Sequence, residues 1–316
     1  MKPTTKKSTT KPVAVPKSKQ GTFIPELGTL AGRALLVDMT VHYWVPKAAD
    51  KDLSKETEEK YDTNGTFSKQ LLDQHIIKPV HSAMKRCETT HRELTLPWED
   101  GGARILNSAI YLRYEKETRD AVQKYIAEVD GLVSRWCQLI EAKKCTDKSF
   151  KPEHYPSANE IRSRYGVDIR YRPLPIGNDL RCDLAGDALA AVKAAIDSDQ
   201  QDRIKAAVFN IAERIQEVLK HMVDTLNDYK PAVVEKGKTK KKAESTFRDS
   251  LVTNVADLGK LLPSLNVTGD PRIDAIATEM LKLSAVSPDS LRDDDKARAA
   301  TVNAADAILS KVSDFI

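Results

Sequence analysis

The sequence predicts an α+β fold that is mostly α-helical. We expect a small antiparallel sheet at the base of a long, antiparallel, coiled-coil-like helical stalk, followed by C-terminal helices. Apolar residues recur every three or four positions over 107–144 and again over 187–229, which is the helical period. Shorter stretches before and between these segments alternate apolar and polar residues, which is the strand period.

The segment 107–144 contains no proline and a single glycine. The side chain of Asn107 can cap its first turn, and Lys143 and Lys144 lie where the negative end of the helix dipole falls. Such a helix would be about 50 Å long. An apolar stripe of that length needs another long helix to cover it. We therefore expect 187–229 to pair with it in an antiparallel coiled-coil-like stalk.

Alternating residues predict strands at 34–45, 167–172 and 180–184, with the last two joined by a turn at 177–179. The stretch 47–65 is charged and has few apolar residues, so we expect a long surface loop or lid. The sheet would thus be built from three short strands that are distant in sequence.

Local signals predict the remaining helices. Pro79 suits the first turn of a helix that ends near Leu94. Ser157 and Glu160 have the spacing of a capping box, in which side chains and backbone N–H groups bond reciprocally. In the C-terminal third we expect helices at 245–262, 272–283 and 296–315.

Four regions follow from composition. We expect a disordered Lys-rich tail at 1–22, an α/β base with a long helical hairpin at 23–230, a Lys-rich linker at 231–244 and a C-terminal helical region at 245–316.

The net charge of +4 is unevenly distributed. The tail carries six lysines and no acid, and the stretch 236–242 carries five lysines and no acid. Without these two stretches the rest of the chain has a net charge of −7. The sequence therefore predicts an acidic body with two basic segments, which could attract nucleic acid or simply keep the protein in solution.

The sequence lacks the common motifs of catalysis. It contains no G-x-x-x-x-G-K-[ST], G-x-G-x-x-G or G-x-S-x-G motif, and no His-His or His-Cys pair at metal-ligand spacing. Cys87 and Cys137 lie on or beside apolar stripes, so we expect both to be buried and unreactive. We expect no enzymatic activity, cofactor, metal site or small-molecule substrate. An enzyme whose site is assembled from distant residues is the alternative.

Single-stranded nucleic acid is a second candidate ligand. Arg170 and Arg172 flank Tyr171 on a predicted strand, and single strands bind to basic groups beside an aromatic ring. The competing interpretation is a solvated strand face with salt-bridged arginines. The candidates for nucleic-acid contact are Lys6, Lys7, Lys11, Arg170, Tyr171, Arg172, Lys240, Lys241 and Lys242.

Five segments are informative together: VHYWVPKAADKDL at 41–53, LPW at 96–98, HYPSA at 154–158, FRDSLV at 247–252 and LLPSLNVTGDP at 261–271. In this order they resemble a domain family of unknown function carried by bacteriophages and prophages. The resemblance implies no reaction and no catalytic residue. Some members are encoded near MoxR-type AAA+ ATPases and von Willebrand A-type proteins, which implies an adaptor or assembly role.

We therefore expect a non-enzymatic phage protein that acts through protein–protein contacts, by self-association or by docking to a partner such as an AAA+ ATPase. The alternative is a single-stranded nucleic-acid-binding or annealing accessory protein. No apolar run approaches the roughly 18 residues of a membrane span, and the scattered cysteines are typical of an intracellular chain. We expect the protein in the cytoplasm of the bacterial host cell, away from membranes.

Overall fold

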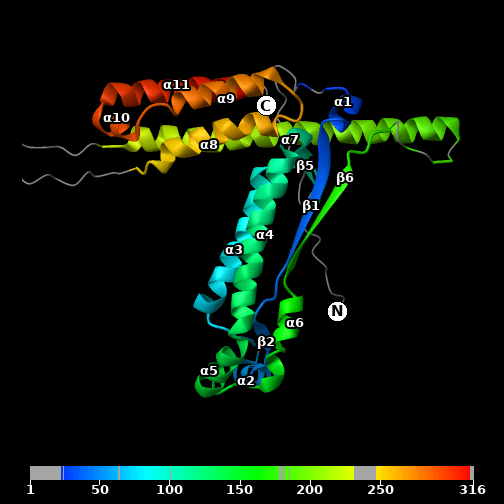
Figure 1. Ribbon diagram of the computed structural model, residues 1–316, viewed down its shortest axis with the longest axis vertical. Coiled ribbons are helices and arrows are strands. Elements are labelled where there is room, and N and C mark those ends of the chain that lie inside the picture. The colour runs from blue at the N-terminus through cyan, green and yellow to red at the C-terminus, as the bar shows by residue number, and fades with distance from the viewer. Residues whose placement is uncertain are drawn as a thin grey trace, which may run out of the picture. The chain divides into compact units, whose positions relative to one another are not determined.

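The computed structural model describes residues 23, 25–62, 65–99, 101–177, 180, 182–183, 185–230 and 247–313. Helices predominate around a small antiparallel sheet, which confirms the predicted α+β, mostly helical class (Figure 1). The chain divides into two compact units. The first unit is Glu26–Arg203, and the second is formed by the chain from Ile204 onwards. The predicted tail at 1–22 and linker at 231–244 lie outside the described residues.

The main sheet of the first unit has the strand order β4-β5-β1-β6. Strand β1 (Ala34–His42) pairs antiparallel with β5 (Arg104–Asn107) on one side and with β6 (Gly166–Pro173) on the other. Strand β4 (Leu96–Pro97) pairs with β5 and forms the opposite edge. The strands predicted near 34–45 and 167–172 are therefore confirmed as β1 and β6.

The third predicted strand, at 180–184, is wrong. Leu180, Cys182 and Asp183 have no strand structure, and positions 181 and 184 lie outside the described residues, as do positions 178 and 179 of the predicted turn. The second neighbour of β1 is β5 instead. A strand of four residues is too short to show an alternation that stands out from its surroundings.

Two helices of the first unit, α1 and α3, contact strand β1 of this sheet. Helices α3 and α4 pack against each other along their lengths (Figure 1). Short 3-10 turns precede α4, at Ser108–Ile110, and α6, at Pro152–His154. The helices are α1 (Leu27–Ala31), α2 (Lys51–Tyr61), α3 (Gln74–Glu93), α4 (Tyr111–Ser134), α5 (Trp136–Thr146) and α6 (Ala158–Ser163).

The helix predicted at 107–144 is divided at Arg135 into α4 and α5. Neither proline nor glycine causes the break. Trp136 is 1% exposed, its ring meets the ring of Trp44 edge-to-face at 5.6 Å, and its indole N–H donates to the carbonyl oxygen of Pro156 at 2.9 Å. These buried contacts fix Trp136 in position. The chain therefore bends beside a tertiary anchor that helical periodicity does not reveal.

The stretch 47–65, predicted to be a loop or lid, contains regular structure. Strand β2 (Lys47–Ala49) pairs with β3 (Ser68–Gln70), and α2 follows β2 directly. Asp50 caps α2, because its carboxylate accepts the backbone N–H groups of Asp52 and Leu53 at 3.2 and 3.4 Å. Helix α2 buries none of its residues, so it has no apolar stripe for a sequence pattern to reveal.

The predicted helix at 187–229 forms the unbroken helix α7 (Gly186–Asp228), which spans 43 residues. Its buried stripe from Ile204 onwards lies in the second unit, whereas the stripe of α4 is covered by α3 in the first unit. The stripe of α4 is therefore covered by α3 and not by the segment that was predicted to pair with it. The buried large apolar residues of this part of α7 are Ile204, Val208, Ile211, Ile215, Leu219, Met222 and Leu226.

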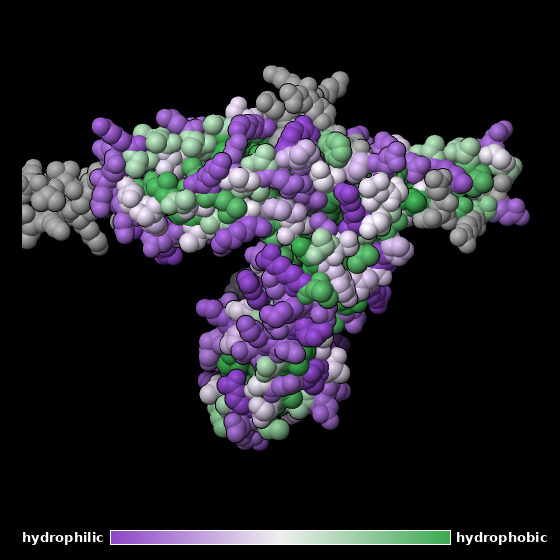
Figure 2. Space-filling model, turned by 45° about the horizontal axis from the view of Figure 1, so that its top comes forward, coloured by the Kyte–Doolittle hydropathy of each residue, from purple (hydrophilic) through white to green (hydrophobic). Residues whose placement is uncertain are grey.

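The other helices of the second unit follow α7. Helix α9 packs against α8 and α11, and the short α10, unforeseen in sequence, packs against α11 (Figure 1). On the face shown in Figure 2, the C-terminal helices carry green and pale patches between purple ones. The bounds are α8 (Ser250–Leu265), α9 (Pro271–Leu283), α10 (Pro288–Asp293) and α11 (Asp295–Ser313).

Aromatic and guanidinium groups join the two ends of the chain that flank residues 231–246. The rings of Tyr229 and Phe247 meet edge-to-face at 5.1 Å. Arg292 lies over the ring of Phe247 and Arg298 over the ring of Tyr229, each at 5.0 Å from the centroid. Such cation–π contacts tie α11 and the chain before it to the end of α7.

Candidate binding surfaces

Strand β6 carries the arginines and tyrosine that the sequence singled out. Successive side chains of a strand point to opposite faces of the sheet. Tyr171 therefore faces α4, where its ring lies 5.6 Å from that of Tyr111, while Arg170 and Arg172 lie on the other face. The ring and the two arginines therefore do not share a face of the sheet, as a single-strand site on β6 would require.

The arginine face of β6 contains paired charges. Arg172 donates to Asp38 at 2.7 Å and lies 3.7 Å from a carboxylate oxygen of Glu99. His42 and Asp168 approach within 2.9 Å on the same face. Exposed pairs of this kind contribute about 0–1 kcal/mol each. This face thus presents opposite charges in turn, and it has no aromatic platform of its own.

The remaining predicted contact residues cannot be placed beside this strand. They all fall outside the described part of the chain: Lys6, Lys7, Lys11, Lys240, Lys241 and Lys242.

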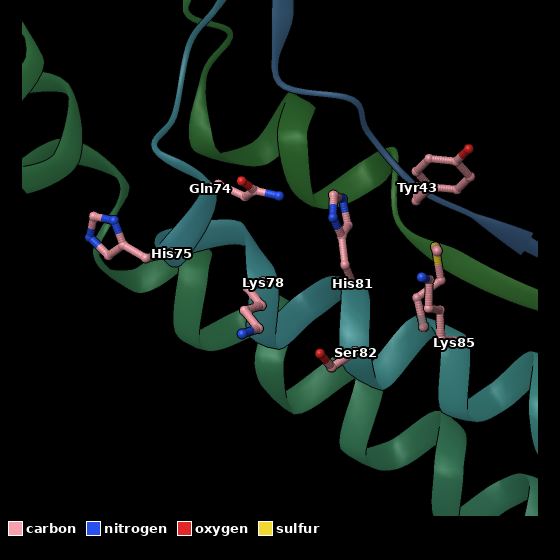
Figure 3. Close-up of a pocket in the computed structure, with 8 residues that line it drawn as sticks. Tyr43, Gln74, His75, Lys78, His81, Ser82 and Lys85 are labelled. Atoms are coloured by element: carbon pink, nitrogen blue, oxygen red, sulfur yellow. The ribbon is translucent and has the colours of Figure 1, made fainter.

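A second surface, which we call the α3 groove, lies along one exposed strip of α3 (Figure 3). It has a volume of about 690 Å³. The strip lies opposite the face that buries Ile77, Val80 and Cys87 in the core. Gln74 and His81 project into the groove in Figure 3. Its lining residues are Tyr43, Gln74, His75, Lys78, His81, Ser82, Met84 and Lys85.

The α3 groove is cationic, because Lys78 and Lys85 are among its lining residues and no carboxylate is. Within the described part of the chain, neither Lys78 nor Lys85 forms an ion pair. This surface was not predicted from the sequence. The sequence shows the helical spacing of Lys78, His81 and Lys85. It does not show that Tyr43 lies beside the strip that they form.

A third surface, the α9/α11 groove, is apolar and has a volume of about 480 Å³. Leu283 and Ile308 are buried at its floor, whereas Ala300, Ala304 and Ala307 are exposed to solvent. Glu279 and Lys282 are its charged lining residues. The other lining residues are Val286, Ala297 and Thr301.

Buried polar groups and cysteines of the first unit offer little reactivity. Burial raises the pKa of the Cys87 thiol to about 11, which suits the predicted inert residue. The prediction that Cys137 is buried is wrong, because its side chain is exposed on α5. All four cysteines are free thiols. Burial, helped by the nearby Arg104 guanidinium, lowers the pKa of His91 to about 4.

Among the described residues, no three His, Cys, Asp or Glu side chains are grouped as metal ligands would be. None of the described helices has a stretch that is both long enough and apolar enough to cross a membrane. Comparison of the chain with protein-family models, curated proteins and solved structures found no match. The resemblance to a phage family therefore stays a prediction based on the five sequence segments.

Proposed function

We propose that this chain is a non-enzymatic bacteriophage protein that acts through protein–protein contacts in the cytoplasm of the bacterial host. Its role would be that of an adaptor or assembly factor, as the resemblance to the phage family implies. The observation that carries the proposal is the α9/α11 groove, which combines a buried apolar floor with a row of solvent-exposed alanines. Apolar surface of this kind at a concave site favours a partner.

The shape of the α9/α11 groove favours an amphipathic helix as its occupant. Ala300, Ala304 and Ala307 recur at the helical spacing along α11, so one shallow strip of small side chains runs beside α9. Small side chains allow another helix to approach closely, and its anchors at i, i+3, i+4 and i+7 would contact the apolar floor.

Charges at the ends of this groove predict a polarity for the occupant. Asp293 and Asp294 are exposed and precede the first alanine of the groove, whereas the adjacent Asp295 pairs with Arg298. At the other end, Lys311 pairs with Glu279 at 2.5 Å. We therefore propose an occupant with basic residues at the end that lies near the acids. A MoxR-type AAA+ ATPase or another phage protein would supply it, and a second copy of this chain is the competing occupant.

The test uses two matched variants of α11. Ala304→Glu places a charge in the α9/α11 groove, and Ala299→Glu places the same charge at an exposed position of the same helix outside the groove. A protein recovered from phage-infected cells with the full chain as bait would be purified, and its affinity for each variant measured. Mass photometry of the chain alone would detect self-association.

The proposal expects Ala304→Glu to weaken binding at least tenfold and Ala299→Glu to leave it unchanged. Concentration-dependent dimers that Ala304→Glu abolishes would identify a second copy as the occupant. Equal binding by both variants would remove the groove from the interface. A strictly monomeric chain that captures no partner would overturn the function itself.

A second candidate function is that of a single-stranded nucleic-acid-binding or annealing accessory protein. Strand β6 gives this candidate little support. Tyr171 faces away from Arg170 and Arg172, and Arg172 forms ion pairs with Asp38 and Glu99. The α3 groove favours this candidate instead, because it combines unpaired lysines with an exposed aromatic ring. Binding that falls steeply with added salt is the measurement that tests it.

A further inference from the structure

We propose that the α3 groove is a binding site for single-stranded nucleic acid, with Lys78 and Lys85 on the phosphates and the ring of Tyr43 against a base. The proposal rests on the second candidate function above and assigns that function to residues other than those of β6. It places the site in the first unit, on the helix strip shown in Figure 3.

The basic groups of the α3 groove form a row along the helix. From His75 to Lys85 the helix rises about 15 Å, because each residue adds about 1.5 Å. Lys78, His81 and Lys85 follow one another at helical spacing, so they are attached along one strip of α3. A line of donors suits a chain of phosphates better than one small anion.

The charge of this row is not neutralised within the groove. None of the lining residues is acidic. The flanking acids on the chain are Asp73 and Glu88. Asp73 precedes α3 and accepts a hydrogen bond from the ammonium group of Lys143 at 2.6 Å, and Glu88 follows Lys85 by three positions without forming an ion pair with it in the described structure. Neighbouring cations without counter-charges repel one another, and a polyanion removes that repulsion while it releases its own counterions.

Tyr43 supplies the aromatic surface. It follows β1 and is 49% exposed, while the next residue, Trp44, is 6% exposed and belongs to the core cluster. Neighbouring residues of an extended segment point to opposite sides. Burial of Trp44 therefore directs the ring of Tyr43 outwards, into the lining of the groove.

Buried tyrosines hold the backbone on both sides of Tyr43. The hydroxyl of Tyr125 donates to the carbonyl oxygen of His42 at 2.7 Å, and the hydroxyl of Tyr165 donates to that of Trp44 at 3.4 Å. The exposed ring is therefore attached to a fixed backbone. A preorganised aromatic ring loses little conformational freedom when a base stacks on it.

These features favour a single strand over a duplex. In a duplex the base faces are stacked on each other and only phosphates and base edges are accessible, so an exposed ring gains no stacking partner. In a single strand the base faces are free, and aromatic rings beside a cationic groove are the common means of binding them. The arrangement reads no base edge, so we expect little sequence preference.

The experiment measures fluorescence anisotropy of a fluorescein-labelled single strand of twelve thymidines with the full chain, at 50 and 200 mM NaCl. A blunt duplex of the same length is the comparison ligand. The test variants are Lys78→Gln/Lys85→Gln and Tyr43→Leu. The matched control is Lys116→Gln/Lys124→Gln, which removes two exposed lysines of α4 in the same unit. Circular dichroism confirms that each variant is folded.

We expect the groove double variant to bind about tenfold more weakly than the control at 50 mM NaCl. Its salt dependence should also be shallower by about 1.4, because each lost phosphate contact removes about 0.7 from the slope of log K against log[salt] for single strands. Tyr43→Leu should lose affinity on the order of tenfold with its slope unchanged, because it removes stacking and not charge.

Three outcomes would overturn the inference separately. If the wild-type chain does not bind the single strand at 50 mM NaCl, the second candidate function and its site both fail. If the wild-type chain binds but the groove variant matches the control, the function stands and the site is elsewhere on the chain. If the duplex binds as tightly as the single strand and Tyr43→Leu has no effect, the assignment to single strands is wrong.

Discussion

The Nδ1 atom of His91 lies 2.8 Å from the hydroxyl oxygen of Tyr114, inside the interface between α3 and α4. His91 is 6% exposed and Tyr114 is fully buried. Burial is the main reason that the pKa of His91 falls to about 4, and burial raises the pKa of Tyr114. Both groups are therefore neutral in the folded protein near pH 7, and the imidazole accepts or donates one hydrogen bond within the helix pair.

This pair predicts a loss of stability in mild acid. In the unfolded chain His91 takes up a proton below about pH 6.5, whereas in the folded chain it does so only below about pH 4. The unfolded state thus binds more protons between these values, so stability falls as the pH drops from about 6.5 to 4, by up to about 3 kcal/mol. Urea unfolding followed by tryptophan fluorescence measures the first unit, which contains Trp44, Trp98 and Trp136.

The matched variants are His91→Gln and His221→Gln, the second of which changes an exposed histidine of α7. We expect His91→Gln to be less stable than wild type at pH 7 but to lose less stability on acidification. A wild-type chain that is no more acid-sensitive than His91→Gln would contradict this account of the pair.

Asp50 predicts a local effect on α2. Its carboxylate is 2% exposed, caps α2 and lies 3.7 Å from the ammonium group of Lys69, which is 7% exposed. Burial alone would raise the pKa of Asp50, but the N–H of Leu53 and the ammonium group of Lys151 outweigh burial and lower it. Asp50→Ala leaves Lys69 without this counter-charge, so we expect faster hydrogen exchange in α2 and a lower midpoint of urea unfolding.

The control for this change is Asp52→Ala. The side chain of Asp52 is 80% exposed and pairs with Lys151 at the surface. Asp52→Ala should therefore leave hydrogen exchange in α2 close to that of wild type. The same exchange rates in both variants would mean that Asp50 does not hold the start of this helix.

Gly177 predicts a steric effect. A Cβ atom added there would lie 2.8 Å from the Oδ1 atom of Asp197 and 2.9 Å from the carbonyl oxygen of Lys193, both on α7. The N–H of Gly177 donates to that same Oδ1 atom at 2.9 Å. Gly177→Ala must therefore push the chain away from α7, and we expect it to lower the free energy of unfolding by about 1–3 kcal/mol. Unchanged stability would show that this segment shifts without loss.

At Gly131 we expect alanine to change the free energy of unfolding in the opposite direction. It lies within α4, is exposed, and a Cβ atom added there would meet nothing within 4 Å. Alanine restricts the unfolded chain and has the higher helix propensity, so Gly131→Ala should raise the free energy of unfolding by about 0.5–1 kcal/mol. Urea unfolding of this variant beside Gly177→Ala compares the two glycines directly. A loss of stability in Gly131→Ala would contradict the claim that a Cβ atom at this position meets no neighbouring atom.

Local sequence signals predicted those helices well whose regularly spaced apolar residues are buried on one face. The stripe of α4 appears at the expected spacing, from Tyr114 to Leu132. The capping box also forms, because the N–H of Ser157 donates to Glu160 at 2.7 Å and the N–H of Glu160 donates to the hydroxyl of Ser157 at 3.3 Å. Signals of this kind depend on residues within one turn of each other.

Contacts between distant segments could not be predicted in this way. The apolar stripe of α4 could be covered by α3 or by the segment 187–229. Both have helical periodicity, so periodicity alone does not show which of them packs against α4. The position of Tyr43 beside α3 likewise follows from the burial of Trp44 against Trp136, 92 positions along the chain. The separation of Tyr171 from its flanking arginines is different, since strand alternation alone predicts it.

Hydrogen–deuterium exchange of the full chain with and without its purified partner tests the proposed docking function most directly. The account predicts that protection on binding is concentrated in 279–286 of α9 and the chain after it and in 297–308 of α11, which line the α9/α11 groove. It also predicts that Ala304→Glu removes this protection and that Ala299→Glu retains it. Protection confined to other helices, with the α9/α11 groove exchanging as in the free chain, would contradict the proposed function.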